Sequence, residues 1–137
     1  MRAVVDANVL ISAVLSSRGA SAKLLRASRD GAFELIMSEL LLAELDRAFG
    51  YPKLRKRIPA DKAAAFIGWL RDHGTMAEDP TSPPPIRSPD PDDDYLLALA
   101  ISQRAFLVTG DQHLLGVGGD LPILPPAEVL RRLARDG

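Results

Sequence analysis

The stretch AVVDANVLI at residues 3–11 decides the fold of this chain. It begins as a short apolar run of strand type, is interrupted by Asp6 and Asn8, and continues over residues 9–15 as an apolar segment with helical character. The pattern predicts a strand, a turn and a helix in immediate succession. A strand that leads so directly into a helix is typical of proteins that alternate the two elements.

The same alternation continues outward along the chain. Residues 33–37 predict a second strand, and Ser38 is placed to cap a Leu-rich helix that reaches about Phe49. A third strand is expected at residues 106–108 and a short fourth strand at residues 123–124. Strands that alternate with helical segments indicate an α/β fold with a mainly parallel sheet. Further helices are expected at residues 21–30 with Ser21 as cap, at 59–73, at 92–103 and from Pro126 onward, with an extended proline-rich loop at 79–91.

Length and composition fit one soluble domain that spans residues 1–137, with 47% hydrophobic and 26% charged residues. The sequence has no cysteine, which excludes disulfides and thiolate metal sites. The apolar run at residues 96–101 is too short to span a bilayer, and Asp6 and Asn8 weaken the interpretation of the N-terminus as a signal peptide. We therefore expect a cytoplasmic protein without membrane contact. The net charge of −1 argues mildly against a nucleic-acid binder, unless a metal neutralises some of the acids.

Four acidic residues fall where the ends of the expected strands would bring them together. Asp6 and Asp111 follow two strands, Glu44 lies on the helix after the strand at 33–37, and Asp94 lies in the first turn of its helix. In an open parallel sheet, ligands bind beyond the carboxyl ends of the strands. We therefore expect the four carboxylates to converge at one edge of the sheet.

Each acid also has an ordinary structural explanation. Asp6 can cap the helix that follows it, Asp94 can complement a helix N-terminus, and Asp111 can be a turn residue. Glu44 is harder to explain in this way, because it falls on the apolar face of its helix. Charged groups are rarely buried there unless they are paired or bound to a metal.

A cluster of carboxylates repels itself, and some of its members stay protonated unless a cation is present. Oxygen ligands without cysteine suit Mg²⁺ or Mn²⁺ rather than structural zinc. Such ions activate a water molecule and neutralise charge on a phosphoryl group. The four acids therefore indicate metal-dependent hydrolysis of a phosphodiester.

Five segments in order resemble the PIN-domain family, and specifically its branch of toxin components of toxin–antitoxin systems. The resemblance covers nearly the whole chain and is carried by VDANVLI (5–11), SELLLAEL (38–45), YPKL (51–54), PDPDDDYLLALA (89–100) and LVTGD (107–111). It implies a three-layer α/β/α sandwich with a central mainly parallel sheet. It also implies a Mg²⁺- or Mn²⁺-dependent endoribonuclease that acts as a toxin, with an antitoxin partner and a homodimeric state.

The resemblance further assigns roles to individual residues. The catalytic and metal-binding acids would be Asp6, Glu44, Asp94 and Asp111. Supporting residues would be Asn8, Ser38 and Thr109. The run of aspartates leaves open which of Asp92, Asp93 and Asp94 contacts the metal, with Asp92 as the reserve candidate.

A basic cluster beside Tyr51 is the expected place of RNA contact, and consists of Lys53, Arg55, Lys56 and Arg57. Its charges would meet phosphates, and the tyrosine ring would stack on a base. A solvated loop face explains the same cluster equally well.

Two other functions compete with an RNA-cleaving toxin. The first is a non-catalytic PIN-like module that binds RNA or a protein, and the complete acid set argues against it. The second is a phosphoryl-transfer receiver, which also gathers acids at strand ends. A receiver needs a lysine after a late strand, and residues 109–111 offer none. The leading hypothesis is a metal-dependent ribonuclease.

Overall fold

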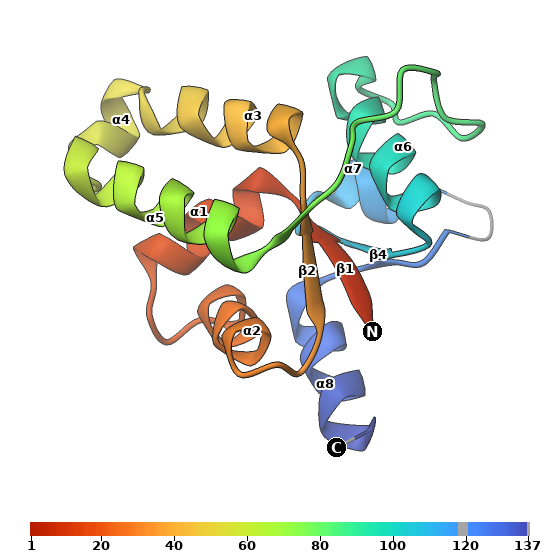
Figure 1. Cartoon of the computed structure of the whole chain (residues 1–137), viewed down its shortest axis with the longest axis horizontal. Helices are drawn as coiled ribbons and strands as arrows, with labels where there is room; N and C mark the ends of the chain where they lie inside the picture. The colour runs from red at the N-terminus through yellow and green to blue at the C-terminus, as the bar shows by residue number, and fades with distance from the viewer. Residues whose placement is uncertain (118–120, 137) are drawn as a thin grey trace.

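The expected alternation of strands and helices is present in the computed structural model, which describes residues 1–117 and 121–136 (Figure 1). The strands are β1 (Arg2–Val5), β2 (Glu34–Met37), β3 (Thr75–Met76), β4 (Phe106–Val108) and β5 (Ile123–Leu124). The helices are α1 (Ala7–Leu15), α2 (Ala20–Arg29), α3 (Glu39–Phe49), α4 (Pro52–Arg55), α5 (Ala60–His73), α6 (Asp94–Gln103), α7 (Gln112–Leu115) and α8 (Pro126–Asp136), with a 3₁₀ turn η1 at Pro91–Asp93.

The five strands form one sheet in the order β3-β2-β1-β4-β5, and every neighbouring pair is parallel. The chain builds the sheet from β1 outward through β2 to β3, and then returns to the other side of β1 for β4 and β5. The order therefore reverses between β1 and β4, where Val5 pairs with Val108. Such a reversal is the usual position of a binding crevice in open α/β sheets.

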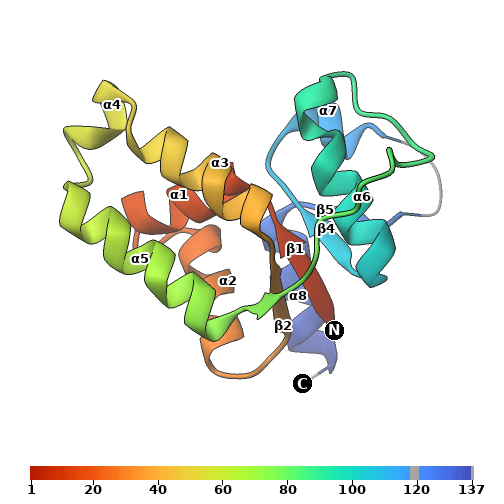
Figure 2. The same ribbon diagram turned by 45° about the horizontal axis from the view of Figure 1, so that its top comes forward.

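Helices cover both faces of the sheet, as the resemblance implied. Figure 2 shows α1, α2, α3 and α5 on one side and α6 and α7 on the other. Right-handed crossovers explain this division, because connections that run in opposite directions along a sheet place their helices on opposite faces. The last helix, α8, packs against α2. The α/β class and the parallel sheet are thus confirmed.

The strands are apolar on both faces because helices cover both of them. Val4, Ile36 and Leu107 are fully buried at the centre of the core. Helix α6 is buried from Leu96 through Ala100, which explains why its sequence shows no polar stripe. Replacing Leu97, which is 0% exposed, by alanine would cost about 2–5 kcal/mol of unfolding free energy.

Some expectations about local structure were wrong. Strand β3 was not predicted, since its two residues are exposed and carry no alternation. The N-cap of α2 is Gly19. Ser21, the expected cap, is a residue of the helix itself and is buried. The helix expected from residue 92 begins as the 3₁₀ turn η1 and becomes α-helical only at Asp94. Within residues 1–117 and 121–136, no helix is both long enough and apolar enough to cross a membrane.

Candidate metal and phosphodiester site

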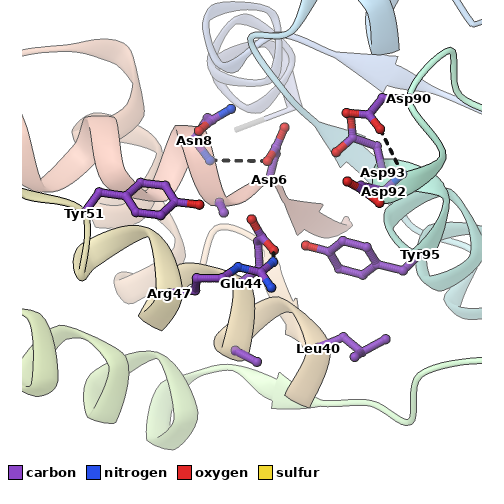
Figure 3. A pocket seen from close by; sticks show the side chains of 12 residues that line it. Asp6, Asn8, Leu40, Glu44, Arg47, Tyr51, Asp90, Asp92, Asp93 and Tyr95 are labelled. Carbon is purple, nitrogen blue, oxygen red and sulfur yellow. Dashed lines mark hydrogen bonds and ion pairs between the residues drawn. The ribbon is translucent and has the colours of Figure 1, made fainter.

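A pocket of about 530 Å³ lies beyond the carboxyl end of β1, between α3 on one side and the start of α6 on the other (Figure 3). It is therefore next to the reversal in strand order. Its walls come from the turn after β1, from one face of α3, from Tyr51, and from the segment that includes η1. The lining residues are Asp6, Ala7, Asn8, Leu40, Ala43, Glu44, Arg47, Tyr51, Asp90, Asp92, Asp93 and Tyr95.

Asp6 is the most enclosed acid of the pocket, with 6% of its surface exposed. One carboxylate oxygen accepts a 3.3 Å hydrogen bond from the backbone nitrogen of Asn8, which caps α1. The other accepts a 2.8 Å hydrogen bond from the hydroxyl of Thr109, at the end of β4. Burial raises the pKa of Asp6 above its ordinary value, although the bond from Thr109 acts in the opposite direction. The hydrogen bonds therefore fix the orientation of the Asp6 carboxylate, but they only partly offset the cost of burying its negative charge.

The run of aspartates places Asp93 in the pocket, next to Asp90 and Asp92. Asp90 caps η1 by accepting a hydrogen bond of 3.0 Å from the backbone nitrogen of Asp92. Burial, followed by repulsion from Asp6 and Asp90, raises the pKa of Asp93 to about 6. Acids from two distant parts of the chain therefore repel one another in this pocket. A bound cation would reduce that repulsion.

Asp94 is not among the residues that line the pocket. Its carboxylate accepts a 2.7 Å hydrogen bond from the backbone nitrogen of Ser88 and lies 3.3 Å from the guanidinium of Arg87. These contacts fasten the proline-rich loop to the start of α6. The sequence assigned the third acid position to Asp94, whereas the geometry favours Asp93 for that position.

Glu44 lines the pocket from α3, with 36% of its side chain exposed. It forms an ion pair with Arg47, one turn further along the same helix. Ser38, the expected supporting residue, is buried and caps α3 through a 3.3 Å bond to the backbone nitrogen of Leu41. Its contribution is to fix the start of the helix that carries Glu44.

Asp111 does not line the pocket. Its side chain accepts a 2.9 Å hydrogen bond from the backbone nitrogen of His113 and caps α7. Its backbone nitrogen donates to the Thr109 hydroxyl at 3.0 Å. The charge of Asp111 nevertheless contributes to the raised pKa values of Asp6 and Asp93.

Of the residues expected to contact RNA, only Tyr51 lies at the pocket. Tyr51 lines it and is 53% exposed. None of the four basic residues after it is a lining residue; Lys53, Arg55, Lys56 and Arg57 are exposed on and just after α4. Asn8, the other expected supporting residue, lines the pocket and is exposed.

Arg47 and Tyr95 are lining residues that received no role from the sequence, whereas Asp93 was one of three aspartates among which the sequence left the metal contact open. Arg47 follows Glu44 by three positions, a spacing that brings helix side chains together and would have been a usable signal. Tyr95 enters the pocket opposite Tyr51, and both hydroxyls point toward Glu44 and Arg47 (Figure 3). Burial and the charge of Asp6 raise the pKa of Tyr95 well above its ordinary value, so its hydroxyl stays a hydrogen-bond donor.

Among the described residues, no three Asp, Glu or His side chains lie close enough together to enclose a metal ion in this arrangement. The donor set still fits Mg²⁺ or Mn²⁺, because every acid in the pocket offers carboxylate oxygens. Mg²⁺ usually keeps several waters and binds through one or two carboxylates, so a closed cage is not required. Asp6 and Asp93, whose pKa values are raised, are the acids that gain most from such an ion.

Comparisons with known proteins agree with this fold. The family model described as PIN domain matches residues 2–113. The crystal structure of PAE2754 from Pyrobaculum aerophilum has a TM-score of 0.66 at 19% identity, over 98% of this chain and 90% of that one. VapBC2 from Rickettsia felis, bound to a DNA fragment from their promoter, has a TM-score of 0.63 at 13% identity, over 90% of this chain and 97% of that one. At these identities the two structures support the fold alone, and no curated protein matches the chain.

Proposed function

This chain belongs to the PIN-domain family, whose members are generally nucleases, and from that premise we propose that it is a Mg²⁺- or Mn²⁺-dependent endoribonuclease. The observation that carries the proposal is the pairing of Asp6 and Asp93 across one pocket, where the charge of Asp6 helps to raise the pKa of Asp93. Such repulsion between carboxylates is costly in a site without a cationic ligand.

Asp6 and Asp93 would hold the ion directly, with Glu44 as a third ligand from α3, and Asp111 would add negative charge that acts on both aspartates. When bound, the ion would activate water and neutralise charge on a phosphodiester. Asp94, assigned to this set by sequence, would instead keep the proline-rich loop attached to α6, through Ser88 and Arg87.

The remaining residues would position the substrate and the acids. Thr109 holds one oxygen of Asp6, which leaves the carboxylate a fixed orientation toward the pocket. Tyr51 offers an exposed ring at the rim, where an unstacked base of single-stranded RNA can be accommodated. The basic residues on and just after α4 would bind phosphates of the RNA that extends beyond the pocket.

A protein partner is the second part of the proposal. The structural neighbour from Rickettsia felis was crystallised as VapBC2 with promoter DNA. We propose by analogy that this chain is the toxin of a toxin–antitoxin pair, and that it forms a homodimer. Neither partner is needed for the chemistry described above, so the two parts can be tested separately.

The test is incubation of a mixed RNA pool with the purified chain and Mg²⁺ or Mn²⁺, beside EDTA and an Asp6→Asn control. The expected result is cleavage with metal, abolished by EDTA and in the variant. The alternative, a non-catalytic module, predicts RNA binding without cleavage and without any effect of EDTA. Metal-independent cleavage that survives in Asp6→Asn would point to a contaminating nuclease and contradict the proposal.

A further inference from the structure

Arg47 is the only basic side chain among the residues that line the pocket, which also holds five acids: Asp6, Glu44, Asp90, Asp92 and Asp93. Its guanidinium is ion-paired with Glu44, and Figure 3 shows the pair between the hydroxyls of Tyr51 and Tyr95. The positive charge of Arg47 also acts on Tyr95 across the pocket, because it lowers the pKa of that hydroxyl. Burial and the neighbouring aspartates raise the same pKa more strongly. Arg47 therefore belongs to the site, although it cannot bind a metal.

The partner of Arg47 is also the candidate metal ligand on α3. A carboxylate that accepts hydrogen bonds from a guanidinium has fewer lone pairs left for an ion. The ion pair is accessible to solvent, since the Arg47 side chain is 65% exposed and that of Glu44 is 36% exposed. Exposed pairs of this kind contribute little to stability, so a divalent ion can displace the guanidinium.

We propose that Arg47 acts as an internal cation exchanged by the metal: it neutralises Glu44 in the metal-free protein and, once displaced, binds a phosphate of the RNA. The inference rests on the proposed function, since it assumes that metal and RNA meet in this pocket. Once the metal has displaced it from Glu44, the guanidinium can pair with another anion. A phosphodiester offers oxygens to which the guanidinium can donate bidentate hydrogen bonds. The same residue would thus disfavour metal binding and favour RNA binding.

The test separates these two effects in one variant. Arg47→Ala removes both a competitor for Glu44 and a positive charge that repels the ion. Mn²⁺ affinity measured by calorimetry should therefore rise, by about two- to fivefold on the scale of an exposed ion pair. Affinity for a short fluorescent single-stranded RNA, measured by anisotropy in Ca²⁺, should fall about tenfold, as expected when a charge-assisted hydrogen bond is removed. The RNA affinity of Arg47→Lys should lie between those of wild type and Arg47→Ala, because lysine keeps the positive charge but lacks the bidentate N–H donors of the guanidinium.

Arg131→Ala is the matched control. Arg131 forms an exposed ion pair with Glu128 at the same helical spacing on α8, remote from the pocket, so its removal should change neither affinity. If Arg47→Ala leaves Mn²⁺ affinity unchanged or weaker, or leaves RNA affinity unchanged, the exchange is wrong while the metal site stands. If wild-type protein binds no Mn²⁺ at all, the proposed function itself fails, and the inference fails with it.

Discussion

The hydroxyl of Thr109 donates a 2.8 Å hydrogen bond to the carboxylate of Asp6, across the ends of the neighbouring strands β4 and β1. Both residues are buried, and the same hydroxyl accepts from the backbone nitrogen of Asp111. One side chain therefore couples two of the acids to the sheet. The bond also opposes the effect of burial on the pKa of Asp6, and so helps to keep it ionised.

Thr109→Val should remove this bond while keeping the shape of the side chain. Leaving a buried charged group without one of its partners should lower the unfolding free energy by about 1–3 kcal/mol, measured with urea at neutral pH. The pKa of Asp6 should rise further, since the largest effect that lowers it is removed.

Thr109→Ser keeps the hydroxyl and removes only a methyl group, so it should retain most of the stability. Equal destabilisation of the two variants would show that the methyl packing, and not the hydrogen bond to Asp6, is what matters at this position.

The stability of the metal-free protein should depend on pH through Asp93. Its pKa is raised from 3.8 to about 6 in the folded state, so the folded protein binds the proton more tightly than the unfolded chain does. The favourable contribution is complete below about pH 4 and is lost as the pH rises through about 6. Asp93→Asn has no such proton to lose. The unfolding free energy of the variant relative to wild type, measured in EDTA, should therefore increase as the pH rises across this interval.

Other carboxyls have the opposite dependence, which is why the difference between variant and wild type is the quantity to measure. The pKa values of Glu34, Glu39 and Glu128 are lowered by hydrogen bonds and ion pairs, so their contributions are lost as the pH falls. A difference that stays flat from about pH 4 to about pH 7 would mean that Asp93 does not sense the neighbouring acids.

The basic cluster on and just after α4 (the α4 cluster) should bind RNA through phosphates rather than bases. Lys53→Gln combined with Lys56→Gln should flatten the dependence of log affinity on log salt by about 0.7 for each phosphate that the variant no longer neutralises. Arg55 is left unchanged because it also donates to the backbone oxygen of Phe49.

A charge-matched control is Arg18→Gln combined with Lys23→Gln, because both residues are exposed, one just before α2 and the other on it. If both double variants retain the wild-type salt dependence, the α4 cluster is a solvated face and RNA approaches the pocket by another route.

The parts of the fold that sequence could predict are those in which burial leaves a pattern. The apolar runs of β1, β2 and β4 are each followed by a polar residue, and this made both the strands and their shared edge predictable. Strand β3 was not predicted because both of its residues are exposed, and helices α4 and α7 were not predicted because a single helical turn shows no apolar periodicity.

The site was only partly predictable for a different reason. Aspartates at consecutive positions point in directions about 100° apart on a helix, so the choice between Asp93 and Asp94 depends on where η1 ends and α6 begins. In the structure Asp93 lines the pocket, whereas Asp94 contacts Ser88 and Arg87. Whether Tyr95 lines the pocket depends on the same boundary between η1 and α6.

The decisive measurement is calorimetry of Mn²⁺ binding by wild type, Asp93→Asn and Asp94→Asn under identical conditions. We expect wild type to bind Mn²⁺ and Asp93→Asn to bind it at least about tenfold more weakly, the lower end of the effect of mutating even a supporting partner. Asp94→Asn should bind within about twofold of wild type, because its carboxylate is engaged with the proline-rich loop. Loss of binding in Asp94→Asn with binding retained in Asp93→Asn would contradict the account, as would a wild-type protein that binds no Mn²⁺.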